Sequence, residues 1–212
     1  MNPKDIVRTG YDNISHTYRG DAIDHNDPAV AAYVQWVNEL IALVPAASAV
    51  LDLGCGNGVP VAHLLAEAGF AVTGVDISPV QIGRAQARIP NARFVCADMT
   101  ALDFPAQSFA AIASFYAIIH VPLAEQRALF TKIYHWLRPG GYLMAIVGAG
   151  AWTGTEENWL DVAGAQMYWS HTDTATYQEW LVEQGFVICW TRFVPEGNGG
   201  HSLFLAQRLA GL

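Results

Sequence analysis

The chain has 212 residues, of which 52% are hydrophobic and only 14% charged, a balance that excludes a disordered protein and allows one α/β domain with a sizeable core. Its 19 acidic and 11 basic residues give a formal net charge of −8 without any basic cluster, which argues against nucleic acid or an anionic membrane surface as a partner. The three cysteines form no CxxC pair and no run of about 18 apolar residues occurs, so we expect a cytoplasmic protein.

The first part of the chain predicts helices before any strand. Residues 3–20 mix charged residues with Tyr11, Ile14 and Tyr18, which is typical of a short helix or an ordered arm. Pro28 is a favourable first residue of a helix, and apolar residues at helical spacing follow it as far as Pro45.

From residue 49 onward, short strands and helices alternate. The strand segments are almost wholly apolar, which is typical of parallel strands covered by helices on both faces. The predicted strands cover residues 49–53, 71–76, 92–98, the start of 109–119, and 142–150, and the predicted helices cover residues 60–69, 79–89 and 122–137.

The pattern changes after residue 150. An aromatic-rich loop is predicted over residues 151–171, followed by a helix over 174–185. Two further strand segments, 186–194 and 201–209, flank the short segment PEGNGG, which permits an antiparallel hairpin and forbids a crossover.

The segment VLDLGCGNG, residues 50–58, runs from a strand directly into Gly54, Gly56 and Gly58. A glycine-rich turn between a first strand and a helix is where open α/β sheets bind nucleotide ligands. The dinucleotide fingerprint GxGxxG would need a glycine where this chain has Val59, so the spacing disfavours a pyrophosphate ligand. A purely structural glycine turn is the alternative.

Acidic residues end the next two predicted strands. Asp76 ends the second strand and Asp98 ends the third. Because the carboxyl ends of parallel strands meet at one edge of the sheet, the glycine turn and both acids are expected to lie together. One acid of this kind is often a helix cap, but three strand ends in register favour a ligand site.

These residues carry a resemblance. VLDLGCGNG, VTGVDIS, ADM and LRPGGYL resemble successive motifs of the class I S-adenosylmethionine-dependent methyltransferases, over roughly residues 45–150. The resemblance implies an α/β, Rossmann-like seven-stranded sheet in the order 3-2-1-4-5-7-6, with strand 7 antiparallel and helices on both faces. It also implies S-adenosylmethionine as the cofactor.

By the same resemblance, the glycine turn faces the methionyl part of the cofactor, Asp76 takes the ribose hydroxyls and Asp98 accepts from the adenine amino group. Tyr11 and Tyr18 resemble the N-terminal arm with which many small-molecule methyltransferases close over the cofactor; their alternative role is to anchor a surface helix. The implied cofactor-binding set is Tyr11, Tyr18, Asp52, Gly54, Cys55, Gly56, Gly58, Asp76, Ile77, Asp98, Met99 and Phe115.

The sequence marks the residues of the acceptor pocket less specifically than those of the cofactor site. His120 follows the fourth strand and is expected to act as a base or an orienting group, although a lone histidine is often only a hydrogen-bonding filler. Tyr116, Tyr168, Trp169 and His201 are the other candidates for the acceptor pocket. No HExxH motif or paired Cys/His spacing occurs, so no metal is expected.

We therefore expect a single methyltransferase domain over residues 1–212: a helical arm (1–44), a cofactor-binding core (45–150) and an acceptor side (151–212). The reaction is expected to transfer a methyl group to an oxygen, sulfur or nitrogen of a small molecule, and the protein to be a monomer or homodimer. The segment SFYA lies where nucleobase- and amide-methylating relatives often carry (N/D/S)PP(Y/F), which disfavours those acceptors.

An NAD-type oxidoreductase and a non-catalytic cofactor-binding module remain the alternatives. Reduction of added NAD would favour the first, and cofactor binding without turnover the second.

Overall fold

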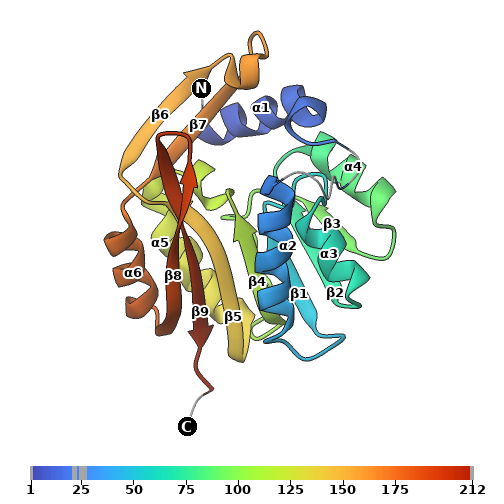
Figure 1. Ribbon diagram of the computed structural model, residues 1–212, viewed down its shortest axis with the longest axis vertical. Helices are drawn as coiled ribbons and strands as arrows, with labels where there is room; N and C mark the ends of the chain where they lie inside the picture. The colour runs from blue at the N-terminus through green and yellow to red at the C-terminus, as the bar shows by residue number, and fades with distance from the viewer. Residues whose placement is uncertain (1, 21–22, 24–27, 211–212) are drawn as a thin grey trace.

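The computed structural model describes residues 2–20, 23 and 28–210 (Figure 1). Seven strands form one sheet in the order β3-β2-β1-β4-β5-β9-β8. Strands β1 to β5 are parallel, whereas β9 pairs antiparallel with both β5 and β8. The sheet strands are β1 (Ala49–Leu53), β2 (Ala71–Asp76), β3 (Arg93–Cys96), β4 (Phe109–Phe115), β5 (Leu137–Gly148), β8 (Phe186–Glu196) and β9 (Gly199–Arg208). With β8 and β9 counted as the sixth and seventh strands, the predicted fold and strand order are confirmed.

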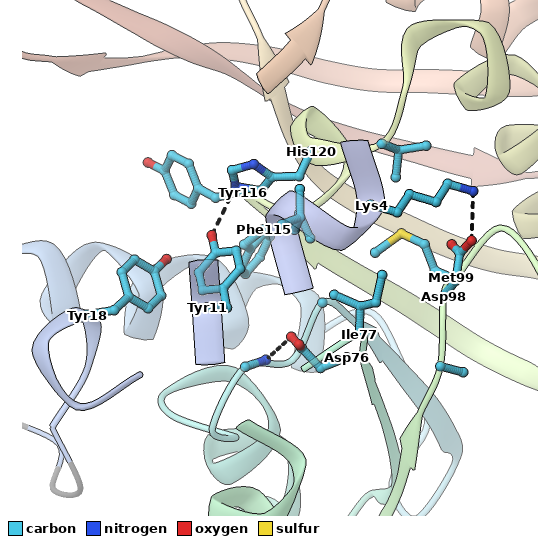
Figure 2. A pocket seen from close by; sticks show the side chains of 16 residues that line it. Lys4, Tyr11, Tyr18, Asp76, Ile77, Asp98, Met99, Phe115, Tyr116 and His120 are labelled. Carbon is cyan, nitrogen blue, oxygen red and sulfur yellow. Dashed lines mark hydrogen bonds and ion pairs between the residues drawn. The ribbon is translucent and has the colours of Figure 1, made fainter. Parts of the chain in front are cut away.

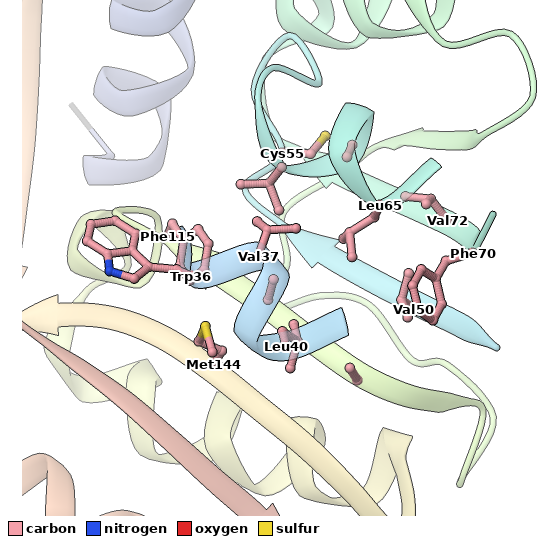
Figure 3. Packing of buried hydrophobic residues seen from close by; sticks show 14 of the residues in the cluster. Trp36, Val37, Leu40, Val50, Cys55, Leu65, Phe70, Val72, Phe115 and Met144 are labelled. Atoms are coloured by element: carbon pink, nitrogen blue, oxygen red, sulfur yellow. The ribbon is translucent and has the colours of Figure 1, made fainter. Parts of the chain in front are cut away.

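Helices cover both faces of this sheet. One face packs against α2 (Pro28–Ile41), α3 (Val61–Glu67) and α4 (Pro79–Arg88), and the other against α5 (Leu123–Trp136) and α6 (Thr174–Glu183). Successive strand residues alternate between the two cores: Leu143 faces α5 and Met144 faces α2. Figure 3 shows Trp36 and Val37 of α2 lying against the strands beside Phe115.

The prediction of a loop over residues 151–171 is wrong. This segment forms an antiparallel two-stranded sheet of β6 (Trp152–Glu157) and β7 (Gln166–His171), joined through the short helix η2 (Trp159–Asp161). The β6 sequence WTGTEE is exposed at nearly every position, so it lacks the alternation of apolar and polar residues that marks a half-buried strand. Its backbone is paired all the same, residue by residue with β7.

Helix α1 (Pro3–Tyr18) lies over the carboxyl edge of the sheet, between the β6–β7 hairpin and α4 (Figure 1). Asn2 caps it by accepting a hydrogen bond from the amide of Lys4. A third, smaller core of Val7, Ile14, Trp159 and Met167 joins α1 to the hairpin. Gly10 permits this close packing, since a Cβ there would lie 2.2 Å from the carbonyl oxygen of Gln166.

Candidate functional site

Two cavities meet at the carboxyl edge of the sheet, under α1. The larger has a volume of about 630 Å³ and the smaller about 380 Å³, including the solvent at their open mouths. Tyr18, Gly54, Gly56 and Phe115 line both, so the two cavities are neighbours, and together they are called the chamber. The roof of the larger cavity is one stripe of α1, formed by Lys4, Val7, Tyr11 and Tyr18 at helical spacing (Figure 2).

The glycine turn forms the floor where the cavities meet. Gly54 has φ +80°, and a Cβ there would lie 2.0 Å from the Cβ of Ala117, so only glycine fits. Gly56 faces open space within the chamber. Gly58 lines neither cavity; its missing side chain instead makes room for Ile89 and Ala85. The structure therefore gives Gly58 a packing position beside α4.

Asp76 is 8% exposed and lines the larger cavity. Its Oδ2 accepts a hydrogen bond from the Gly56 amide at 2.9 Å (Figure 2), and its Oδ1 accepts one from the Ser78 amide at 2.9 Å. Burial raises its pKa to about 6, although these amides favour the ionised form. Each carboxylate oxygen has a further lone pair for a ligand hydroxyl.

Asp52, at the end of β1, lines the smaller cavity and is 2% exposed. Its Oδ2 atom is buried and has no hydrogen-bond partner among the described residues. Burial first, and then the nearby charge of Asp76, raise the pKa of Asp52 to about 7. An unpaired buried carboxylate beside a cavity is suited to a cationic ligand group.

Arg19, which sequence reasoning missed, also lines the smaller cavity. Its guanidinium lies 4.8 Å from the ring centre of Tyr33 and 5.4 Å from that of Tyr18. Burial opposes its charge, but the two tyrosines outweigh this effect and leave the pKa of Arg19 raised. The smaller cavity therefore presents one anionic and one cationic group. This pairing matches an amino acid moiety, which carries both charges.

Asp98 lines the larger cavity beside Ile77 and Met99. Its Oδ1 accepts from the amide and hydroxyl of Thr100, and its Oδ2 accepts from Nζ of Lys4 at 2.7 Å. Lys4 was not among the predicted site residues. Its position three residues before Val7, on the same stripe of α1, was the one sequence signal for Lys4. Its partner Asp98 lies 94 positions away in the chain.

His120 ends the short helix η1 (Ile118–His120), which follows β4, and is 5% exposed. Its Nδ1 lies 2.7 Å from the carbonyl oxygen of Tyr168, and because a carbonyl only accepts, Nδ1 carries the proton. Nε2 then accepts from the Tyr11 hydroxyl at 2.9 Å (Figure 2). Burial lowers the pKa of His120 to about 4, so its imidazole is neutral.

The other acceptor-side candidates lie at different depths. Tyr116 lines the larger cavity, and its backbone has φ +58°, an uncommon value for a bulky residue that recurs at functional sites. His201 lies behind it, with ring centres 5.0 Å apart, and its Nδ1 is 3.0 Å from Oε2 of Glu196. The ring of Trp169 lies against that of His120, with centres 4.4 Å apart and planes tilted by 41°, and Tyr168 holds His120 through its carbonyl. His201, Tyr168 and Trp169 thus support the lining residues and do not themselves line either cavity.

The chamber brings together most of the predicted cofactor-binding residues. Cys55 lines the smaller cavity and is 6% exposed; burial raises the pKa of its thiol well above the usual value, so it is an unreactive small side chain. Among the described residues, no three His, Cys, Asp or Glu side chains gather as metal ligands. Within the same part of the chain, no helix has the length and apolar character needed to cross a bilayer.

Comparisons with known proteins agree with this geometry. The family model described as "Methyltransferase domain" matches residues 50–141. A sterol 24-C-methyltransferase of Gibberella zeae is 30% identical over 158 residues, covering 72% of this chain and 40% of that protein. A 2-methyl-6-phytyl-1,4-hydroquinone methyltransferase of Synechocystis sp. is 36% identical over 152 residues, covering 63% of this chain and 46% of that protein. The chain thus spans less than half the length of these relatives.

Among solved structures, magnesium protoporphyrin IX methyltransferase from Synechocystis, crystallised with bound S-adenosylmethionine, superposes with a TM-score of 0.71. The match covers 98% of each chain at 21% identity. At that identity the likeness shows a shared fold.

Proposed function

We propose that this chain, which belongs to the class I S-adenosylmethionine-dependent methyltransferases, transfers a methyl group from S-adenosylmethionine to a small-molecule acceptor. The observation that carries the proposal is the pair of neighbouring cavities at the glycine turn, with Asp52, Asp76 and Asp98 lining them from three neighbouring strand ends. The expected list of acceptor atoms (oxygen, sulfur, nitrogen) is extended to carbon, because one relative is named as a 24-C-methyltransferase.

The larger cavity suits the adenosyl part of the cofactor. Asp76 offers a carboxylate to the ribose hydroxyls, and Ile77 and Met99 offer apolar surface to the adenine. Asp98 stands where an adenine amino group would donate a hydrogen bond.

The smaller cavity suits the methionyl part. Asp52 offers the charge of its carboxylate to an ammonium group, and Arg19 offers its guanidinium to a carboxylate. When bound, the cofactor supplies an activated methyl group on a positively charged sulfur. Tyr18 and Phe115 line both cavities and present aromatic faces to that charge.

At the acceptor side, the Tyr11–His120 pair can receive a proton. Tyr11 directs its hydroxyl proton at Nε2 of His120, so an acceptor hydroxyl that donates to the Tyr11 oxygen has a route for its own proton. The low pKa of His120 makes it a weak base. It therefore suits an acceptor that releases its proton only as the new bond forms. The remaining catalysis comes from α1, which excludes water and holds the acceptor in line.

The structure argues against the NAD-type alternative. The Gly56 amide, which would be needed for a pyrophosphate, already donates to Asp76. The buried carboxylate of Asp52 beside the same turn would repel a phosphate. Both features favour a ligand with a positive centre.

The test has two stages. Calorimetry is expected to show binding of S-adenosylmethionine or S-adenosylhomocysteine in the micromolar range, with NAD binding far more weakly. A screen of small-molecule acceptors, read as S-adenosylhomocysteine release with mass analysis of the product, then tests transfer. Binding without release on any acceptor would favour the non-catalytic module, and reduction of added NAD would favour the oxidoreductase.

We also propose a domain organisation, a cellular location and an oligomeric state for the protein. We propose one domain over residues 1–212, with the arm (1–44), core (45–150) and acceptor side (151–212) described above. A cytoplasmic location is supported by three free thiols, two of them exposed, and the net charge of −8 disfavours nucleic acid as a partner. A monomer or homodimer is expected, and light scattering would decide between them.

A further inference from the structure

The two halves of α1 are held to the core in different ways. Within the described part of the chain, Lys4 is the one side chain of residues 3–10 with polar contacts outside its own helix. The second half is held to α4 by several contacts with buried groups. Ser78 donates to Asp12 at 2.6 Å, and Ser15 donates to Gln81 at 2.9 Å. Ser15, Ser78 and Gln81 are each at most 1% exposed.

Lys4 joins three elements. Its ammonium donates to Oδ2 of Asp98 at 2.7 Å (Figure 2). It also donates to the Thr100 hydroxyl at 2.7 Å and to Oε2 of Glu125 at 2.5 Å, so that all three of its protons are used. Burial by itself would lower the pKa of Lys4, but the bonds to Asp98 and Glu125 outweigh it and leave the pKa raised. The contacts are partly open to solvent, since the side chain of Glu125 is 41% exposed.

We propose that Lys4 is a latch that closes α1 over the adenine end of the chamber, and that α1 opens at this end by turning about its anchored second half. The inference rests on the proposed function, because it takes the larger cavity as the cofactor chamber. Closure places the Lys4 ammonium on Asp98, so the same contact that shuts the roof also orients the carboxylate meant for adenine. Lys4 is thus a positioning residue that sets the rate at which the cofactor product leaves.

The latch is tested by the dissociation rate of S-adenosylhomocysteine, measured by stopped-flow displacement with tryptophan fluorescence. Trp159 reports on the roof, because its ring lies 5.5 Å from that of Tyr11. Lys4→Met is expected to raise the rate about three- to tenfold, an effect reduced by the partial exposure of the ion pairs. Glu125 lines neither cavity, so Glu125→Gln weakens the latch without touching the ligand and is expected to raise the rate about two- to threefold.

A double variant and a control variant distinguish the latch from other effects of the substitutions. The double variant Lys4→Met/Glu125→Gln is expected to match Lys4→Met alone, because Lys4→Met already removes the ion pair that Glu125→Gln weakens. Arg8→Gln is the matched control: it removes a cation from the exposed side of α1, where Arg8 approaches only Asp5 and Asp12 of the same helix among the described residues, and is expected to leave the rate unchanged.

Hydrogen exchange of the ligand-free protein gives a second readout. In Lys4→Met, amides of residues 5–10 are expected to exchange faster while those of residues 13–18 keep the parent rate. An unchanged dissociation rate in both Lys4→Met and Glu125→Gln, or equal loss of protection along all of α1, would overturn the latch. A parent protein that binds neither S-adenosylmethionine nor S-adenosylhomocysteine would instead refute the proposed function, and the exchange pattern would then decide the latch alone.

Discussion

Asp52 is expected to bind a proton in the ligand-free protein and to lose it when the cofactor binds. Its pKa is raised to about 7, first by burial and then by Asp76. A ligand ammonium in the adjoining cavity would favour the ionised form and lower that pKa. Binding at pH 7 should therefore release about half a proton from Asp52, more near pH 6 and almost none at pH 9.

The assay is calorimetry of S-adenosylhomocysteine binding in buffers of different ionisation enthalpy, which counts released protons. Asp52→Asn has no proton to lose, so the difference between parent and variant isolates this group from Asp76. The variant should also bind about 10–100-fold more weakly, because the ammonium loses a charged partner. Asp103→Asn, an exposed carboxylate elsewhere, is the matched control and should release as many protons as the parent.

Asp52 also affects the stability of the ligand-free protein. Its ionised form favours ligand binding but opposes folding. Because the folded protein holds this proton more tightly than the unfolded chain, the free energy of unfolding falls as pH rises from about 4 to about 7 and changes no further above that. Ionised Asp52 thus costs about 4 kcal/mol at pH 8. Ligand-free Asp52→Asn should be more stable than the parent by about 2–4 kcal/mol at pH 8, with no difference near pH 4. Equal proton release in parent and variant, or equal melting temperatures at pH 8, would refute the reasoning.

Three further predictions follow from the site. Asp76→Ala should weaken cofactor binding by about 1.5–3 kcal/mol in calorimetry, because the ribose hydroxyls lose a charged acceptor; parent-like affinity would remove Asp76 from the site. Deleting residues 1–20 should leave the sheet folded by circular dichroism while kcat/KM falls, because water enters the chamber; an unchanged kcat/KM would remove the arm from the mechanism. His120→Ala should lower kcat by about 10²–10⁴-fold with cofactor affinity within a few-fold, and the acid limb of kcat/KM in the parent should lie near the pKa of about 4; superimposable pH profiles of parent and variant would make His120 a packing residue.

The sheet was predictable because its strands are buried on both faces. Segments such as AVLDL and FAAIASF are apolar except for Asp52 and Ser114, and that pattern in alternation with helices specifies parallel strands. The hairpin of β6 and β7 was not predictable in this way. Strand β6 presents both faces to solvent, so its residues show no periodicity, and its pairing depends on the partner strand and on the packing of β7 against α1.

The site was predictable where the backbone alone brings residues together. The glycine turn, Asp76 and Asp98 lie at the carboxyl ends of three neighbouring parallel strands, so their meeting at one edge follows from topology. The contacts made by side chains across the chamber were not. Tyr11 meets His120 across 109 positions, and nothing in the local sequence of either residue indicates the other. Arg19 follows α1 with no motif around it, and only the fold reveals that its guanidinium faces the smaller cavity.

The charged side chains beside the smaller cavity are explained by binding of a ligand and not by a contribution to the stability of the ligand-free protein. Asp52 lacks a hydrogen-bond partner for Oδ2 among the described residues, and its ionised form opposes folding. Replacement by a neutral residue would relieve that cost, so the carboxylate is best explained by a ligand that arrives with a positive charge. Arg19, a half-buried charge, lines the same cavity, and its guanidinium lies near the rings of Tyr18 and Tyr33. A ligand that carries both an ammonium and a carboxylate would satisfy both groups at once, whereas a nucleotide phosphate would satisfy Arg19 and be repelled by Asp52.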